Sequence, residues 1–123
     1  MQRASSKPAG ATYLDRTERI QRLREAAGRA AERMPSIRRV VLFGSLVAGI
    51  PTPRSDADLV VFVDASPHAE PRDRVPEVLA ALAPLPCPVD LFVVTAAEAA
   101  RMGESGSPIL RVALRSGRDL LGT

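Results

Sequence analysis

The chain of 123 residues contains little cysteine, histidine or aromatic side chain. Cys87 is its only cysteine, which excludes an internal disulfide. A zinc site is not expected from Cys87 and the single histidine, His68. Because Cys87 precedes an apolar run, we expect a small, half-buried side chain there rather than a reactive thiol. Aromatic residues make up 3% of the chain, so alanine, valine and leucine must fill its core.

Long apolar runs and blocks of like charge are also absent. No apolar run reaches the roughly 18 residues that indicate a membrane span, and the polar N-terminus has no apolar signal region. The sequence therefore predicts a cytoplasmic protein without a membrane partner. The formal net charge is +3, but the arginines are dispersed and not interleaved with aromatics. We therefore expect a nucleotide or an acidic protein as partner rather than nucleic acid.

The spacing of apolar residues predicts a single small domain. Residues 1–12, rich in Ser, Ala, Gly and Pro, are expected to form a flexible tail, and residues 13–123 the domain. The first helix should begin at an N-cap formed by Asp15 or Thr17. Because residues 59–63 are continuously apolar, both faces of the sheet should be covered. The predicted elements are helices at 15–34, 74–83, 96–102 and 108–116, a helical turn at 45–48, strands at 38–43, 56–64 and 89–95, and a C-cap at Gly117. This order predicts an α/β (α+β) fold with a small mixed β-sheet and flanking helices.

The segment Val40–Val63 carries most of the chemistry that the sequence offers. An apolar run ends at Gly44 and Ser45, and Asp56 and Asp58 follow ten residues later at the start of a second run. Free backbone N–H groups at a strand end that leads into a helix attract phosphate, and glycine allows close approach. A Gly-Ser pair alone is more often a simple turn, and the aspartates alone could be solvated residues at the start of a strand.

A third acid strengthens the case for a metal site. Asp56 and Asp58 should share one face of their strand, where two like charges repel unless a divalent cation lies between them. Oxygen ligands favour Mg²⁺ or Mn²⁺ over zinc. Asp90 interrupts a later apolar strand, VDLFVV, and would join the pair if that strand lay beside the second. Three carboxylates suit two metal ions. The alternative for Asp90 is an ion pair with Arg38 or Arg39.

The pattern GS-x10-D-x-D, followed by an acid on a later strand, resembles the polymerase-β-type nucleotidyltransferase superfamily. The similarity is greatest to its minimal members, short bacterial and archaeal proteins often encoded beside HEPN-domain toxins. It covers residues 16–121, including the closing segment ILRVALRSGRDLLG. The resemblance implies a nucleotidyltransferase fold.

The resemblance also implies the roles of individual residues. Gly44 and Ser45 would hold the nucleotide triphosphate. Asp56 and Asp58 would bind both metal ions, and Asp90 would complete the site of the catalytic metal. The implied cofactor is Mg²⁺ or Mn²⁺, and ATP would be the substrate.

One part of the motif departs from the family. Minimal members carry arginines just after Gly-Ser in a GSRARG-like run, whereas this chain has GSLVAG, with Leu46 and Ala48 at those positions. Loss of two positive charges would weaken the binding of a triphosphate. Arg54, or Arg38 and Arg39, could compensate.

These features predict a metal-dependent nucleotidyltransferase that resembles protein adenylyltransferases. We expect it to transfer a nucleoside monophosphate, AMP from ATP, to a hydroxyl group of a partner. The resemblance implies a tyrosine of a HEPN toxin as acceptor, which would make the protein an antitoxin. The alternative is an antitoxin that neutralises its toxin by binding alone. We expect transfer to a small molecule less, because enzymes of that kind usually carry an additional helical domain, and transfer to RNA less still, because no basic RNA-binding extension is visible. The sequence leaves the acceptor, the base preference and the oligomeric state open.

Overall fold

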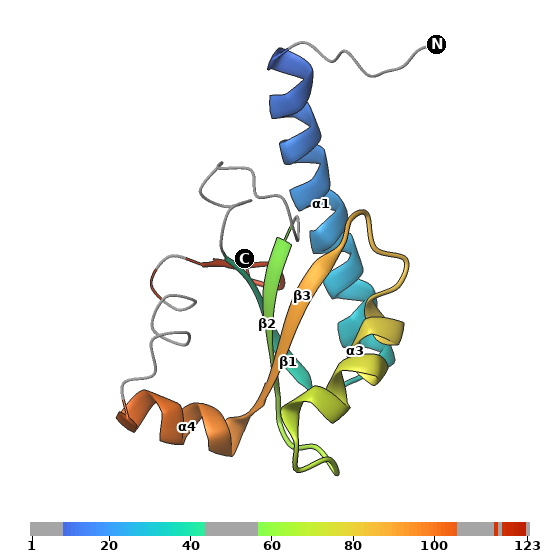
Figure 1. The fold of residues 1–123 in the computed structure, drawn as a ribbon. Coiled ribbons are helices and arrows are strands. Elements are labelled where there is room, and N and C mark those ends of the chain that lie inside the picture. Colours follow the sequence, from blue (N-terminus) through green and yellow to red (C-terminus); the bar gives the residue numbers. More distant parts are fainter. Residues whose placement is uncertain (1–8, 44–56, 106–114, 116, 123) are drawn as a thin grey trace.

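A computed structural model describes residues 9–43, 57–105, 115 and 117–122 of the chain (Figure 1). Of residues 9–16 and 104–105 it describes the backbone only. The helices are α1 (Ala9–Arg33), the 3₁₀ helix η1 (Pro71–Arg74), α3 (Val75–Leu82) and α4 (Ala96–Ser105). The strands are β1 (Ile37–Phe43), β2 (Ala57–Val63), β3 (Val89–Thr95) and β4 (Arg118–Asp119).

The four strands form one sheet in the order β3-β2-β1-β4. β1 pairs antiparallel with β2 and with β4, whereas β2 and β3 are parallel. The parallel pair needs a crossover, which η1 and α3 provide between β2 and β3. The sheet is therefore mixed, which confirms the predicted fold class of a small mixed sheet with flanking helices.

One face of the sheet packs against α1 and α3, as Figure 1 shows. The apolar stripe of α1 includes Leu23, Ala27 and Ala30, which are fully buried. Their small and medium side chains let the helix lie close to the sheet, where Leu59 and Val61 of β2 meet them in one cluster. Among the described residues, the buried members of this cluster are alanine, valine and leucine with two isoleucines, and none is aromatic, in line with the prediction from composition.

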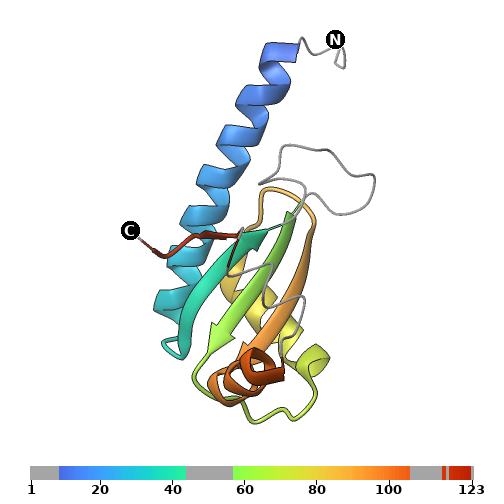
Figure 2. The same cartoon turned by 90° about the vertical axis from the view of Figure 1, so that its left-hand side faces the viewer.

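The other face carries a smaller cluster that is covered by α4 near the end of β3 (Figure 2). Val60 and Phe62 of β2 belong to it, and Met102 of α4 packs against it. Successive residues of β2 therefore enter clusters on opposite faces of the sheet. This arrangement confirms that the continuous apolar run belongs to a strand covered on both sides.

Several predicted boundaries differ from the structure. Helix α1 begins at Ala9, so Asp15 and Thr17 lie inside it and neither is an N-cap. The segment before Asp15 mixes the helix formers Ala9, Ala11 and Leu14 with Gly10 and Thr12, so local propensity gives no sharp start for the helix. The helix predicted at 74–83 begins instead with the 3₁₀ turn η1. The predicted turn at 45–48 lies outside the described residues, as does the helix at 108–116 apart from Arg115.

Strand β4 was not predicted, and Gly117, expected to cap a helix, directly precedes it. The strand is only two residues long, Arg118 and Asp119, and it pairs with Leu42 and Val41 of β1. A two-residue strand carries no periodic apolar pattern. It exists because the backbone of β1 offers an open edge for pairing.

Cys87 is half-buried against the larger core cluster, as expected for a small packing residue. Within the described part of the chain, no helix is both long enough and apolar enough to cross a membrane.

Candidate active site

Two of the three predicted metal-binding acids lie side by side in the sheet. β2 and β3 are parallel, and Asp58 pairs in register with Asp90. Paired residues of adjacent parallel strands lie about 4.8 Å apart at their Cα atoms and direct their side chains to the same face. Asp58 is partly exposed and Asp90 is exposed. The sheet therefore brings these two carboxylates together near the N-terminal ends of β2 and β3, as expected if the third strand lay beside the second.

The other predicted site residues, Gly44, Ser45 and Asp56, lie outside the described residues. Their chain neighbours, however, fix where the connecting segment leaves and re-enters the sheet. Phe43, the last residue of β1, pairs with Asp58, the second residue of β2. Phe43 and Ala57, which flank the segment 44–56, therefore lie at the same end of the sheet as the two aspartates.

The two aspartates lie on the α4 side of the sheet. In β2, Val60 and Phe62 follow Asp58 at steps of two and belong to the cluster on that side. In β3, Val94 follows Asp90 at a step of four and belongs to the same cluster. The strand period of two therefore places Asp58 and Asp90 on the same face as α4. Helix α4 covers this face near the C-terminal end of β3, away from the two aspartates (Figure 2).

An exposed aromatic side chain lies between the aspartates and α4. Phe92 follows Asp90 at a step of two on β3, so it shares the same face. It is 42% exposed, and its ring centroid lies 6.4 Å from that of Phe43. A large aromatic side chain in a mainly apolar strand is usually buried. The sequence signal that indicates otherwise is the D-x-F spacing, which puts the phenyl ring on the same face as a carboxylate.

Next to Phe92 is a hollow of about 240 Å³ between the sheet and α4. Its lining is mainly apolar and includes Val60, Val94 and Met102. Arg101 and Glu98 of α4 are the charged side chains among its lining residues. The face therefore combines a carboxylate pair at one end with an apolar recess at the other.

The arginines proposed as alternative partners of Asp90 bind other acids. Arg38 Nε donates to Asp64 Oδ1 at 2.7 Å, and Arg39 Nε to Asp119 Oδ2 at 3.3 Å. Both belong to the opposite end of β1 from Phe43. The alternative prediction, an ion pair between Asp90 and Arg38 or Arg39, is therefore wrong.

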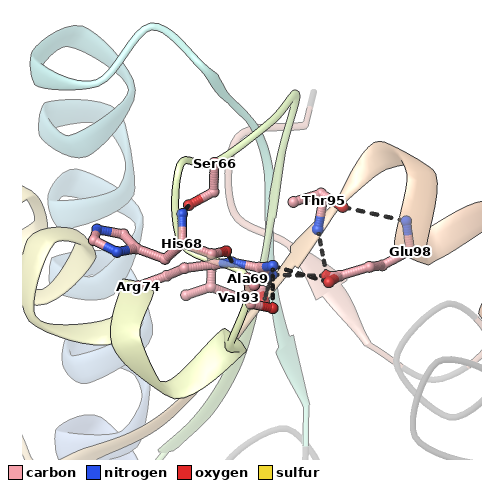
Figure 3. A network of polar contacts seen from close by, with 7 residues as sticks. All are labelled: Ser66, His68, Ala69, Arg74, Val93, Thr95 and Glu98. Atoms are coloured by element: carbon pink, nitrogen blue, oxygen red, sulfur yellow. Dashed lines mark hydrogen bonds and ion pairs between the residues drawn. The ribbon is translucent and has the colours of Figure 1, made fainter.

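A buried arginine that no sequence pattern predicted anchors α4, as Figure 3 shows. Arg74, at the end of η1, is only 3% exposed. Its Nη1 and Nη2 donate to the two carboxylate oxygens of Glu98 at 2.7 and 2.9 Å. The remaining donors bind the carbonyl oxygens of His68, Ala69 and Val93. All five N–H groups of the guanidinium are thus satisfied.

Glu98, the third residue of α4, also takes part in capping the N-terminus of that helix. Its backbone N–H donates to Thr95 Oγ1 at 3.2 Å, and its carboxylate accepts the N–H of Thr95 at 3.1 Å. This reciprocal pair is a capping box, which the T-x-x-E spacing of the sequence encodes. The hydrogen bonds from Arg74 lower the pKa of Glu98 to about 2, against the cost of burial, with a further contribution from the Thr95 N–H. Glu98 is therefore a charged structural residue and does not act as a proton carrier near neutral pH.

The donor set of the carboxylate pair suits a hard divalent cation. Asp58 and Asp90 offer only oxygen atoms, which is the ligand type of Mg²⁺ and Mn²⁺. Among residues 9–43, 57–105, 115 and 117–122, no group of three or more His, Cys, Asp or Glu side chains could hold a metal ion. The described residues thus supply two ligands, and the predicted third, Asp56, precedes Ala57 in the chain.

Comparison with known proteins identifies a family. The family model described as "Nucleotidyltransferase domain" matches residues 23–108. A crystal structure of a Sulfolobus solfataricus protein assigned as a candidate nucleotidyltransferase is similar over 96% of this chain and 90% of that chain, with a TM-score of 0.60 and 19% identity. At this identity the likeness shows a shared fold.

A second solved structure, of a tri-AMPylated Shewanella oneidensis HEPN toxin in complex with an MNT antitoxin, aligns over 91% of this chain and 73% of that chain. The identity is 20% and the TM-score 0.38, which is below the level that indicates a shared fold. No curated protein matches the chain significantly.

Proposed function

Because the chain belongs to the nucleotidyltransferase domain family, we propose that it transfers a nucleoside monophosphate, AMP from ATP, to a hydroxyl group. The observation that carries this proposal is the pairing of Asp58 with Asp90 across two parallel strands. Two carboxylates held side by side repel each other, and a divalent cation between them relieves that repulsion.

Asp58, Asp90 and, from the motif, Asp56 are the residues that would hold Mg²⁺ or Mn²⁺. The metal would neutralise charge on the transferred phosphate and lower the pKa of the acceptor hydroxyl. Gly44 and Ser45 are the residues proposed to bind the triphosphate through backbone N–H groups and a hydroxyl.

The protein side chains would position the reactants and accept a proton. The acceptor oxygen forms a bond to the α-phosphorus, the bond to the bridging oxygen breaks, and pyrophosphate leaves. The hydroxyl proton passes to a carboxylate, for which Asp90 is suitable because it is exposed on the same face as Asp58. Glu98 is excluded from this role by its pKa of about 2 and its bonds to Arg74.

The proposed acceptor is a tyrosine of a HEPN-type toxin, and the proposed biological role is that of an antitoxin in the cytoplasm, where ATP is available. This part of the proposal is supported by the resemblance of the GS-x10-D-x-D pattern and of the closing segment to the minimal members of the family. The test is incubation with the partner, ATP and Mg²⁺, followed by intact-mass measurement of both proteins. We expect the partner to gain the mass of one or more adenylyl groups. Absence of any gain would contradict the enzymatic proposal.

Asp90→Asn should separate catalysis from structure. The variant removes a charge at an exposed position, so its free energy of unfolding should change by no more than about 0.5 kcal/mol. Loss of a proton acceptor and metal ligand should lower the rate of adenylyl transfer by about 100-fold or more. Urea unfolding and the mass assay measure the two effects. A large loss of stability with retained transfer would instead make Asp90 a structural residue.

The second function is an antitoxin that neutralises its partner by binding alone. The GSLVAG run favours it, because Leu46 and Ala48 replace the cations found in related proteins. The double variant Asp58→Ala with Asp90→Ala distinguishes the two functions in a toxicity assay. Full neutralisation by this variant would support binding alone, and loss of neutralisation with retained complex formation would support catalysis.

A further inference from the structure

Phe92 is the most unusual apolar side chain in the described part of the molecule. The chain contains only three phenylalanines and one tyrosine. Phe92 is the one large hydrophobic residue that is exposed among the described residues, at 42%. An isolated exposed apolar residue needs no explanation, but this one lies at the mouth of a recess beside two carboxylates.

The spacing from the carboxylates to Phe92 is fixed by the strand. Phe92 lies two residues beyond Asp90 on β3, on the same face, so their Cα atoms are about 7 Å apart. In a nucleotide, the ribose separates the α-phosphate from the base by a similar length. A nucleotide whose α-phosphate lies at Asp58 and Asp90 can therefore reach Phe92 with its base.

The hollow next to Phe92 provides space of the right kind. Its volume of about 240 Å³ is smaller than a pocket for a whole nucleotide and is suited to a fragment of one. Val60, Val94 and Met102 offer apolar surface, and Phe92 offers the face of a ring. Glu98, the acid in this lining, is bound by Arg74 and by the N–H of Thr95, so it is not available to a ligand.

We propose that Phe92 and the adjacent hollow bind the base of the nucleotide by stacking and apolar contact. The inference rests on the proposed function, because it takes the carboxylate pair as the place of the α-phosphate. Stacking on an aromatic ring is tolerant of base identity, since every base has a π-face. The site should therefore favour purine nucleotides over bare triphosphate while distinguishing ATP from GTP only a few-fold.

Phe92→Trp gives a direct reporter, because the chain contains no tryptophan. Titration of this variant with ATP or GTP, in the presence of Mg²⁺, should quench its fluorescence to a saturating level. Inorganic tripolyphosphate with Mg²⁺ should leave the fluorescence nearly unchanged. The matched control is Ala80→Trp, an exposed position of α3, which packs on the opposite face of the sheet. Its fluorescence should respond to none of these ligands.

Phe92→Ala measures the contribution of the ring to affinity. Isothermal titration should show ATP binding weakened by about 5- to 100-fold, with tripolyphosphate binding unchanged. Urea unfolding checks that this half-exposed substitution leaves the fold intact. If Phe92→Ala changed neither affinity, or changed both equally, the base site would be overturned while the phosphate site stood. If neither ATP nor tripolyphosphate bound the wild-type protein, the proposed function itself would fail, and the base site with it.

Discussion

At the scale of single residues, the contrast between two kinds of arginine is informative. Arg38 pairs with Asp64 at the surface, where its side chain is 68% exposed, and such a pair contributes little to stability. Arg74 pairs with Glu98 at 4% side-chain exposure and satisfies all of its donors. Removal of one partner from a buried pair leaves an uncompensated charge, which makes Arg74 and Glu98 mutually dependent.

Glu98→Gln should therefore destabilise the protein in a pH-dependent way. The folded pKa of Glu98 is about 2, below its ordinary value of 4.5. Its charge thus contributes stability that is fully present above pH 4.5 and is lost as the pH falls through 2. This shift corresponds to roughly 3 kcal/mol. Urea unfolding at pH 7 should show a loss of about that size, and the difference between variant and wild type should shrink toward pH 2.

Glu32→Gln provides the control for this experiment, because Glu32 is an exposed residue of α1. Its effect on stability should be small at every pH. A Glu98→Gln effect as small as that of Glu32→Gln would show that the buried pair contributes nothing to the fold.

At the scale of elements, the short strand β4 depends on its neighbours for its existence. Leu120, directly after it, is 2% exposed in the main core cluster and donates its N–H to Val40 O at 2.7 Å. Asp119 accepts the backbone N–H groups of Leu121 and Gly122 at 3.0 Å, which turns the chain after the strand. One apolar side chain and one turn thus hold an element that has no apolar pattern of its own.

Leu120→Ala should weaken the attachment of β4 to the core and lower the stability of the protein measurably. Truncation of a fully buried leucine removes apolar contacts and leaves a cavity, so the free energy of unfolding should fall by about 3 kcal/mol. Arg118→Ala, at an exposed position of the same strand, should change it by no more than about 0.5 kcal/mol. Equal effects in urea unfolding would mean that β4 is held by its backbone pairing rather than by Leu120.

At the scale of the whole molecule, the two faces of the sheet differ in the residues that they carry. The face toward α1 and α3 holds most of the buried apolar residues. The face toward α4 holds a small cluster, the carboxylate pair and an exposed ring. Stability is therefore concentrated on one side of the sheet, and the groups suited to bind a ligand are gathered on the other.

Binding of MgATP should accordingly stabilise the folded protein by mass action. At a ligand concentration tenfold above Kd the gain is about 1.4 kcal/mol, which should raise Tm by roughly 5 °C in a domain of this size. Thermal unfolding with and without MgATP measures it. The Asp58→Ala, Asp90→Ala double variant should show no shift. An equal shift in that variant would mean that ATP binds elsewhere.

The sequence predicted those parts of the fold that rest on local patterns. The apolar run from Leu59 to Val63 specified a strand covered on both faces, and the Val89–Thr95 strand matched its prediction to the residue. The start of α1 was placed too late because helix propensity before Asp15 gave no sharp signal. β4 and the burial of Arg74 were missed, since two charged residues in a row and an arginine in PRDR are typical of solvent-exposed segments.

By itself, the sequence determined the residue types and spacings of the chemistry: the Gly-Ser turn, the D-x-D pair, Asp90 within an apolar strand, and membership of a nucleotidyltransferase family. Only the tertiary structure decided that Asp58 and Asp90 are paired, because strand neighbours are chosen by packing rather than by distance along the chain. It likewise paired Arg38 and Arg39 with acids other than Asp90 and left Phe92 exposed beside a hollow. The physical reason is the same in each case: local sequence sets the face on which a side chain lies, whereas the assembled sheet and its helices set what lies next to it.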